Sequence, residues 1–83
     1  MREDDLFLKR VDGIINRYNL LHITIGPETR LDEDLGIDSL TLISLSSELE
    51  HEFELTISGD ALTADNFRTV GSVAELVRKL SAN

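Results

Sequence analysis

Three stretches of the chain repeat apolar residues at the spacing of an α-helix. The first predicts a helix from Glu3 to Tyr18 and the second a helix from about Ser39 to Phe53. The third predicts a last helix that opens at Ser72, where Ser72 and Glu75 have the spacing of a capping box. The predicted buried stripes are Phe7, Val11, Ile14, Ile15 and Tyr18; Leu42, Leu45, Leu49 and Phe53; and Val73, Leu76, Val77 and Leu80.

The connections between these helices carry weaker patterns. Residues 19–37 have no clear period, and Gly26-Pro27 breaks any regular element. The segment is rich in apolar residues, so we expect a strap packed across the helices instead of a free loop. These residues are Leu20, Leu21, Ile23, Ile25, Leu31, Leu35 and Ile37. Ile23-Thr24-Ile25 alternates like a strand but has no evident partner, and residues 31–35 suit a single helical turn.

A short third helix is predicted from Asp60 to Phe67. The predicted fold is therefore all-α: a four-helix bundle with three main helices, one short third helix and a long loop between the first two. At 83 residues the chain forms one small domain, 1–83, with a modest core.

Composition and charge narrow the functional classes. The chain has no cysteine, and hence no disulfide framework or thiolate metal site. We expect a cytoplasmic protein, because the acidic N-terminus lacks an apolar signal core and no apolar run has membrane-spanning length. The net charge is −8, and residues 31–67 hold ten acids with no lysine or arginine. Such a segment repels nucleic acid and anionic membranes and attracts basic protein surfaces, although acidity can also serve solubility alone.

The candidate site is the run Leu35-Gly36-Ile37-Asp38-Ser39-Leu40, which opens the second helix. Gly36 allows the backbone to turn, and Asp38 is a strong N-cap candidate. Ser39 then falls on the first helical residue, with its hydroxyl open to water. No base is positioned to make this hydroxyl a nucleophile by itself, so we interpret Ser39 as a residue that a separate protein modifies.

This run, followed by the acidic residues 48–53 at the end of the helix, resembles the acyl carrier protein family, which includes peptidyl and aryl carrier domains. The resemblance spans nearly the whole chain, since length, helix order and Phe67-Arg68-Thr69-Val70 also match. It implies that a phosphopantetheinyl transferase attaches 4′-phosphopantetheine from coenzyme A to Ser39. The chain would then carry acyl or aminoacyl cargo as a thioester and would not itself be an enzyme.

The second helix is the expected docking surface for partner enzymes. Leu40 and Ile43 lie off its buried stripe, beside Ser39 and among acids. The expected partners are an acyl- or aminoacyl-loading ligase and downstream synthase or transferase enzymes with basic docking surfaces. We expect the carrier itself to be a monomer. The expected docking residues are Asp38, Leu40, Ile43, Ser47, Glu48, Glu50 and Glu54.

Three other functions compete with this interpretation. A hydrolase is disfavoured because Ile37 interrupts the lipase-like order of residues and His51 lies on the order of 18 Å along the helix from Ser39. A calcium loop starting at Asp32 lacks the glutamate that such a loop needs at its last position, so no metal site is expected. An acidic protein-interaction module without a prosthetic group explains the acids and the exposed aliphatic residues equally well. It leaves the serine unexplained and stays open as the alternative.

Two segments bear on the type of carrier. Residues 44–47 form a serine-rich turn of the second helix. In carriers of bulk fatty acid synthesis, this helix usually has more acidic residues in its middle turn and larger apolar side chains. Phe67-Arg68-Thr69-Val70 is similar to the corresponding segment of peptidyl and D-alanyl carriers. The resemblance therefore implies a discrete carrier of a specialised fatty acid, polyketide or nonribosomal peptide type pathway, with short acyl or aminoacyl cargo.

Overall fold

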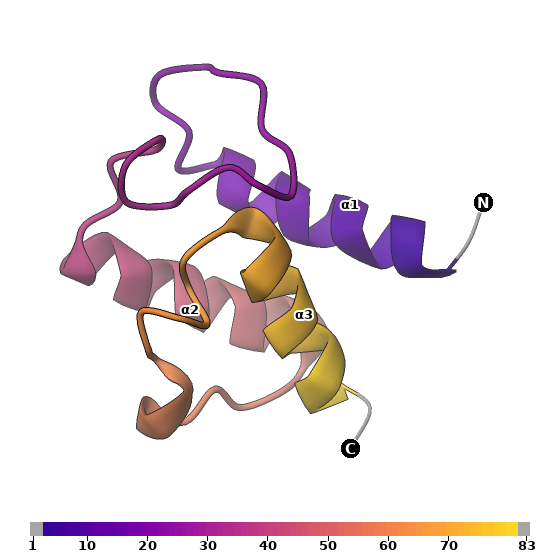
Figure 1. Cartoon of the computed structure of the whole chain (residues 1–83). Coiled ribbons are helices and arrows are strands. Elements are labelled where there is room, and N and C mark those ends of the chain that lie inside the picture. Colours follow the sequence, from indigo (N-terminus) through magenta and orange to yellow (C-terminus); the bar gives the residue numbers. More distant parts are fainter. Residues whose placement is uncertain (1–2, 82–83) are drawn as a thin grey trace.

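Over residues 3–81, three α-helices and one 3₁₀ helix make up the fold (Figure 1). The computed structural model describes residues 3–81, and its elements are α1 (Glu3–Asn16), α2 (Ser39–Phe53), η1 (Gly59–Ala61) and α3 (Val70–Ser81). Between residues 3 and 81 there is no strand, and an isolated antiparallel bridge joins Arg30 to Thr69. No helix in this range is long and apolar enough to cross a membrane. The predicted all-α architecture, with a long segment between the first two main helices, is confirmed.

The core lies where the three α-helices meet. Each helix contributes side chains that are fully buried, as the apolar stripes predict, because this packing removes apolar surface from water. The helical residues with no exposed surface are Val11, Ile15, Leu45, Leu49, Val70, Val73 and Val77. Residues at the ends of the stripes, including Phe7, Tyr18, Leu42, Phe53 and Leu80, are only partly buried.

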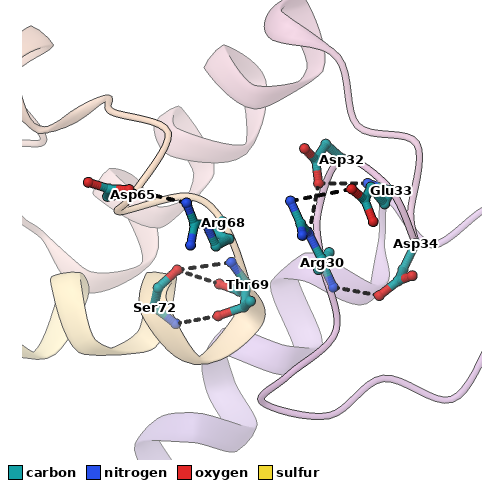
Figure 2. Close-up of polar contacts among 8 residues, drawn as sticks. All are labelled: Arg30, Asp32, Glu33, Asp34, Asp65, Arg68, Thr69 and Ser72. Atoms are coloured by element: carbon teal, nitrogen blue, oxygen red, sulfur yellow. Dashed lines mark hydrogen bonds and ion pairs between the residues drawn. The ribbon is translucent and has the colours of Figure 1, made fainter.

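Two helix ends differ from the prediction. α1 ends at Asn16, because the amides of Arg17 and Tyr18 donate hydrogen bonds to the carbonyls three residues before them, as in a 3₁₀ turn. α3 begins at Val70, two residues before the predicted start. The predicted capping box of Ser72 and Glu75 is wrong in position: Thr69 and Ser72 form it instead (Figure 2). The Ser72 hydroxyl accepts from the Thr69 amide at 3.0 Å, and the Thr69 hydroxyl accepts from the Ser72 amide at 3.1 Å.

The predicted short helix from Asp60 to Phe67 is also corrected. Its regular part is the three-residue η1, which is followed by a turn. Side chains compete with the helical backbone here: the Thr63 hydroxyl accepts from the Asn66 amide, and the Asn66 side chain donates to the Ala61 carbonyl at 2.9 Å. Phe67 is nevertheless buried in the core.

The strap, residues 19–37, leaves the end of α1 and returns to the start of α2 (Figure 1). Leu31 and Leu35 are buried and Ile25 and Ile37 partly so, which confirms that this half of the strap packs on the helices. Residues 31–35 form a turn closed by the amides of Asp34 and Leu35 on the Arg30 carbonyl. The prediction is wrong for the other half, where the remaining apolar residues are exposed: Leu20, Leu21 and Ile23.

Candidate functional site

The site is built at the start of α2. Gly36 has a φ of 68°, a left-handed conformation that costs glycine little, and it redirects the chain into the helix. Asp38 caps the helix, because its Oδ1 accepts from the Thr41 amide at 2.8 Å. This hydrogen bond also holds the pKa of Asp38 below its ordinary value. Ser39 is the first residue of α2 and is exposed, so its hydroxyl sits on a fixed helix end and is open to solvent.

Ser39 borders a groove of about 250 Å³, called here the Ser39 groove. Its apolar walls come from the strap, α2 and the segment before α3, and four charged residues line it as well. The lining residues are Leu31, Ile37, Leu42, Ala64 and Phe67, with Arg30, Asp32, Asp38 and Arg68. Among the described residues that line this groove there is no histidine, and the Asp38 carboxylate is engaged in the cap. The groove can therefore hold a group attached to Ser39, but it lacks the base that would make the hydroxyl a nucleophile.

Of the predicted docking residues, Asp38 caps α2 and is exposed, and the others fall into two groups. Leu40 is 77% exposed and Ile43 55% exposed, and Ser47 on the same face of α2 is also exposed. These three residues are called here the docking face after the role predicted for them, which stays a prediction. Glu54 follows the end of α2, exposed and with a φ of 52°.

Glu48 and Glu50 form the second group, because both are held by contacts within the chain. Glu48 accepts from the Tyr18 hydroxyl at 2.6 Å and from Arg17 at 2.8 Å, and Glu50 accepts from the Ile57 amide at 2.7 Å. A docking role for these two carboxylates stays a prediction, beside the structural role that they have here. The sequence did not indicate the Tyr18 contact, since it depends on how α1 and α2 pack.

The Tyr18–Glu48 contact changes the acidity of both groups. Burial, and then the hydrogen bond to Glu48, raise the pKa of Tyr18 to about 12. The same hydrogen bond, with the neighbouring Arg17, lowers the pKa of Glu48. Both shifts favour the neutral tyrosine and the ionised carboxylate, the pair of states in which the contact is strongest.

Comparison with known proteins decides the family. Residues 18–77 match the sequence model of the family described as "Phosphopantetheine attachment site". The chain belongs to the acyl carrier protein family. It is 40% identical to the acyl carrier protein of Aster yellows witches'-broom phytoplasma over 89% of this chain and 95% of the relative. It is 35% identical to that of Amoebophilus asiaticus over 86% of each chain.

A solved structure shares the fold. It is the crystal structure of Bradyrhizobium japonicum glycine:[carrier protein] ligase complexed with glycylated carrier protein, with 28% identity and a TM-score of 0.67. The match covers 90% of this chain and 99% of the other. The protein is thus a non-catalytic carrier that works with enzyme partners, and its cofactor is covalently bound 4′-phosphopantetheine.

The start of α2 fits this cofactor. An exposed hydroxyl is available for a phosphodiester bond, and the adjoining groove has apolar walls and two arginines. The helix N-terminus favours a negative charge at this position.

Proposed function

We propose that Ser39 carries the 4′-phosphopantetheine group and that this carrier shuttles short acyl or aminoacyl cargo between a loading ligase and downstream enzymes. The observation that carries the proposal is the position of Ser39. It is the exposed first residue of α2, and the exposed Leu40 follows it directly. When bound, the group supplies a thiol that holds the cargo as a thioester. The surrounding residues present this attachment point and guide partner enzymes to it.

The docking face supports this role. Leu40 and Ile43 offer partners an apolar contact beside Ser39, at sites where the folded chain leaves them in water. Ten acids in residues 31–67 steer basic surfaces toward this half of the chain. Charge-led docking on a small apolar contact gives fast association and reversible complexes, which suits a shuttle.

The buried face of α2 supports a short cargo. Leu45 and Leu49 are fully buried in the core, and the Ser46 hydroxyl, also buried, donates to the Ile43 carbonyl at 3.0 Å. A packed core with a hydroxyl in it is a poor lining for a long alkyl chain. The structural similarity to a glycylated carrier further supports an amino acid or another short acid as cargo. We also propose that the chain acts as a cytoplasmic monomer in a specialised pathway.

The attachment is tested by intact mass after incubation with coenzyme A and a phosphopantetheinyl transferase of broad specificity. The wild-type chain should gain one phosphopantetheine and Ser39→Ala none, while Ser44→Ala, which removes an exposed serine of α2 outside the docking face, should gain it normally. A folded, initially unmodified wild-type chain that gains no mass would favour the alternative, an acidic interaction module without a prosthetic group.

Cargo length is tested on the phosphopantetheine-bearing chain loaded chemically with glycyl, acetyl and palmitoyl groups. We expect hydroxylamine to cleave the acetyl and palmitoyl thioesters at similar rates, because both lie outside the core. Marked protection of the palmitoyl form would show that the bundle encloses long chains and would overturn the short-cargo proposal.

Docking is tested by the rate at which a glycine:[carrier protein] ligase glycylates the chain. Leu40→Ser and Ile43→Ser should raise the KM for the carrier, whereas Leu6→Ser, at an exposed leucine of α1, should not. Equal KM values in all three variants would exclude a role of the docking face in this encounter.

A further inference from the structure

Two arginines far apart in the sequence lie side by side at the Ser39 groove. Arg30 and Arg68 border residues 31–67, which hold no lysine or arginine. The bridge between Arg30 and Thr69 joins their segments, and the Leu31 amide donates to the Arg68 carbonyl at 3.0 Å. Figure 2 shows the two side chains on neighbouring segments, and both line the groove that Ser39 borders. The fold thus places two cations beside the modified serine, within the acidic part of the chain.

The two arginines differ in how firmly they are held. The guanidinium of Arg30 lies between two carboxylates, with its Nε 3.5 Å from Asp32 and an Nη 3.5 Å from Glu33. Its side chain is 40% exposed and its Nε is buried without a hydrogen-bond partner among the described residues, so Arg30 is partly enclosed by the groove wall. Arg68 is more loosely held. It pairs with Asp65 at 3.5 Å, and the two side chains are 59% and 90% exposed. An exposed ion pair of this length contributes little to stability and can exchange its partner readily.

We propose that Arg68 is the phosphate-binding residue of this carrier. When Ser39 is modified, Arg68 leaves Asp65 and binds the phosphodiester, while Arg30 remains in the groove wall. This inference rests on Ser39 being the attachment residue, as proposed above.

The charges around the groove explain why a cation is needed there. Attachment places a phosphodiester anion at a groove that Asp32 and Asp38 already line. The start of α2 offsets part of this repulsion, and a guanidinium can offset more through paired hydrogen bonds to two phosphate oxygens. The contact would direct the first part of the prosthetic group toward residues 64–68. It would also make the position of this segment depend on whether the carrier is modified.

The test compares unmodified and modified protein by NMR and thermal melting. Arg68→Gln removes the guanidinium, and the matched control Lys79→Gln removes a cation from the last turn of α3, away from the groove lining. Spectra of the unmodified Arg68→Gln variant identify the Arg68 Nε–H signal of the wild-type chain. Intact mass confirms the modification state of each sample.

We expect the Arg68 Nε–H signal to shift and to exchange more slowly with water when the wild-type chain is modified. Melting gives a second readout. The difference in Tm between modified and unmodified protein should be about 2–4 °C less favourable in Arg68→Gln than in Lys79→Gln. Asp65→Asn, which removes the competing carboxylate, should shift this difference in the favourable direction.

An Arg68 signal unaffected by modification, with equal Tm differences in Arg68→Gln and Lys79→Gln, would overturn the Arg68 contact and leave the proposed function intact. Failure of the wild-type chain to accept the group at Ser39 would instead overturn the proposed function, and this inference with it. The NMR comparison needs only the modified wild-type chain, so it remains decisive if Arg68→Gln is modified poorly.

Discussion

The Tyr18 hydroxyl, two residues after the end of α1, donates a hydrogen bond to Glu48 in α2. Removing this hydroxyl tests how much the hydrogen bond stabilises the bundle. Tyr18→Phe keeps the ring and deletes the donor that lies 2.6 Å from Glu48. A hydrogen bond to a charged group contributes about 1.5–3 kcal/mol. The Glu48 side chain is 37% exposed and keeps Arg17 at 2.8 Å, so water and Arg17 replace part of what is lost. We therefore expect a loss of about 1 kcal/mol, or about 4–8 °C in Tm for a domain of this size.

The pH dependence follows from the two pKa shifts. The pKa of Glu48 is lower in the folded chain than its ordinary value of 4.5, so its contribution is present above that pH and is lost as the pH falls through the folded pKa. The pKa of Tyr18 is raised from 10.0 to about 12. Its contribution is therefore present below pH 10.0 and is lost as the pH rises toward 12. The stability difference between wild type and Tyr18→Phe should shrink at both ends.

Urea unfolding of the wild type, Tyr18→Phe, Glu48→Gln and the double variant measures the coupling directly. At neutral pH we expect a coupling free energy of about 0.5–1 kcal/mol between the two sites. At about pH 3, where carboxylates take up protons, the coupling should fall. Additive single-variant effects at neutral pH, or a coupling that is the same at both pH values, would refute the argument that an ionised Glu48 accepts from Tyr18.

Three further predictions concern the helix cap, the glycines and the acidic charge. Asp38→Ala should lower the Tm in circular dichroism melts, because the Thr41 amide loses its acceptor. Asp38→Asn should retain most of the Tm, because its amide oxygen can accept the same hydrogen bond. Since the pKa of Asp38 is lowered, the part of the loss that depends on its charge should disappear as the pH falls through that pKa, and a loss in Asp38→Asn as large as in Asp38→Ala would contradict the cap. Gly13→Ala should raise the free energy of unfolding by about 1 kcal/mol, because the added Cβ meets no atom within 4 Å and alanine favours the helix. Gly71→Ala should lower it, because the added Cβ would lie 2.9 Å from the Pro27 carbonyl oxygen. Urea unfolding measures both changes in stability, and changes of the same sign would refute this prediction. Moderate salt or Mg²⁺ should raise the Tm by screening the ten acids of residues 31–67, and an unchanged midpoint would show that they are too dispersed to repel one another.

The local features of this carrier are those that the sequence determined by itself. The helical stripes are visible because a period of 3.6 residues places the same residues on one face whatever the helix packs against. The start of α2 is equally local: Gly36 supplies the turn, and Asp38 caps an amide three residues away. The exposure of Leu40 and Ile43 followed from their positions off the buried stripe.

Features that depend on contacts between distant segments were decided by the tertiary structure. The short helix expected from Asp60 to Phe67 is a separate case, because side-chain hydrogen bonds of Thr63 and Asn66 within the segment itself replaced it with η1 and a turn. The exposure of Leu20 and Leu21 depends on where the strap crosses the helices, which no local pattern encodes.

The charged groups of the site show the same limit. The sequence places Glu48 on an acidic helix and Tyr18 on an apolar stripe, and only the packing of α1 against α2 brings them within hydrogen-bonding distance. Arg30 and Arg68 border opposite ends of the acidic segment, and the bridge between the strap and the start of α3 brings them together beside Ser39. Periodicity and capping act over a few residues, whereas these pairings depend on the whole fold.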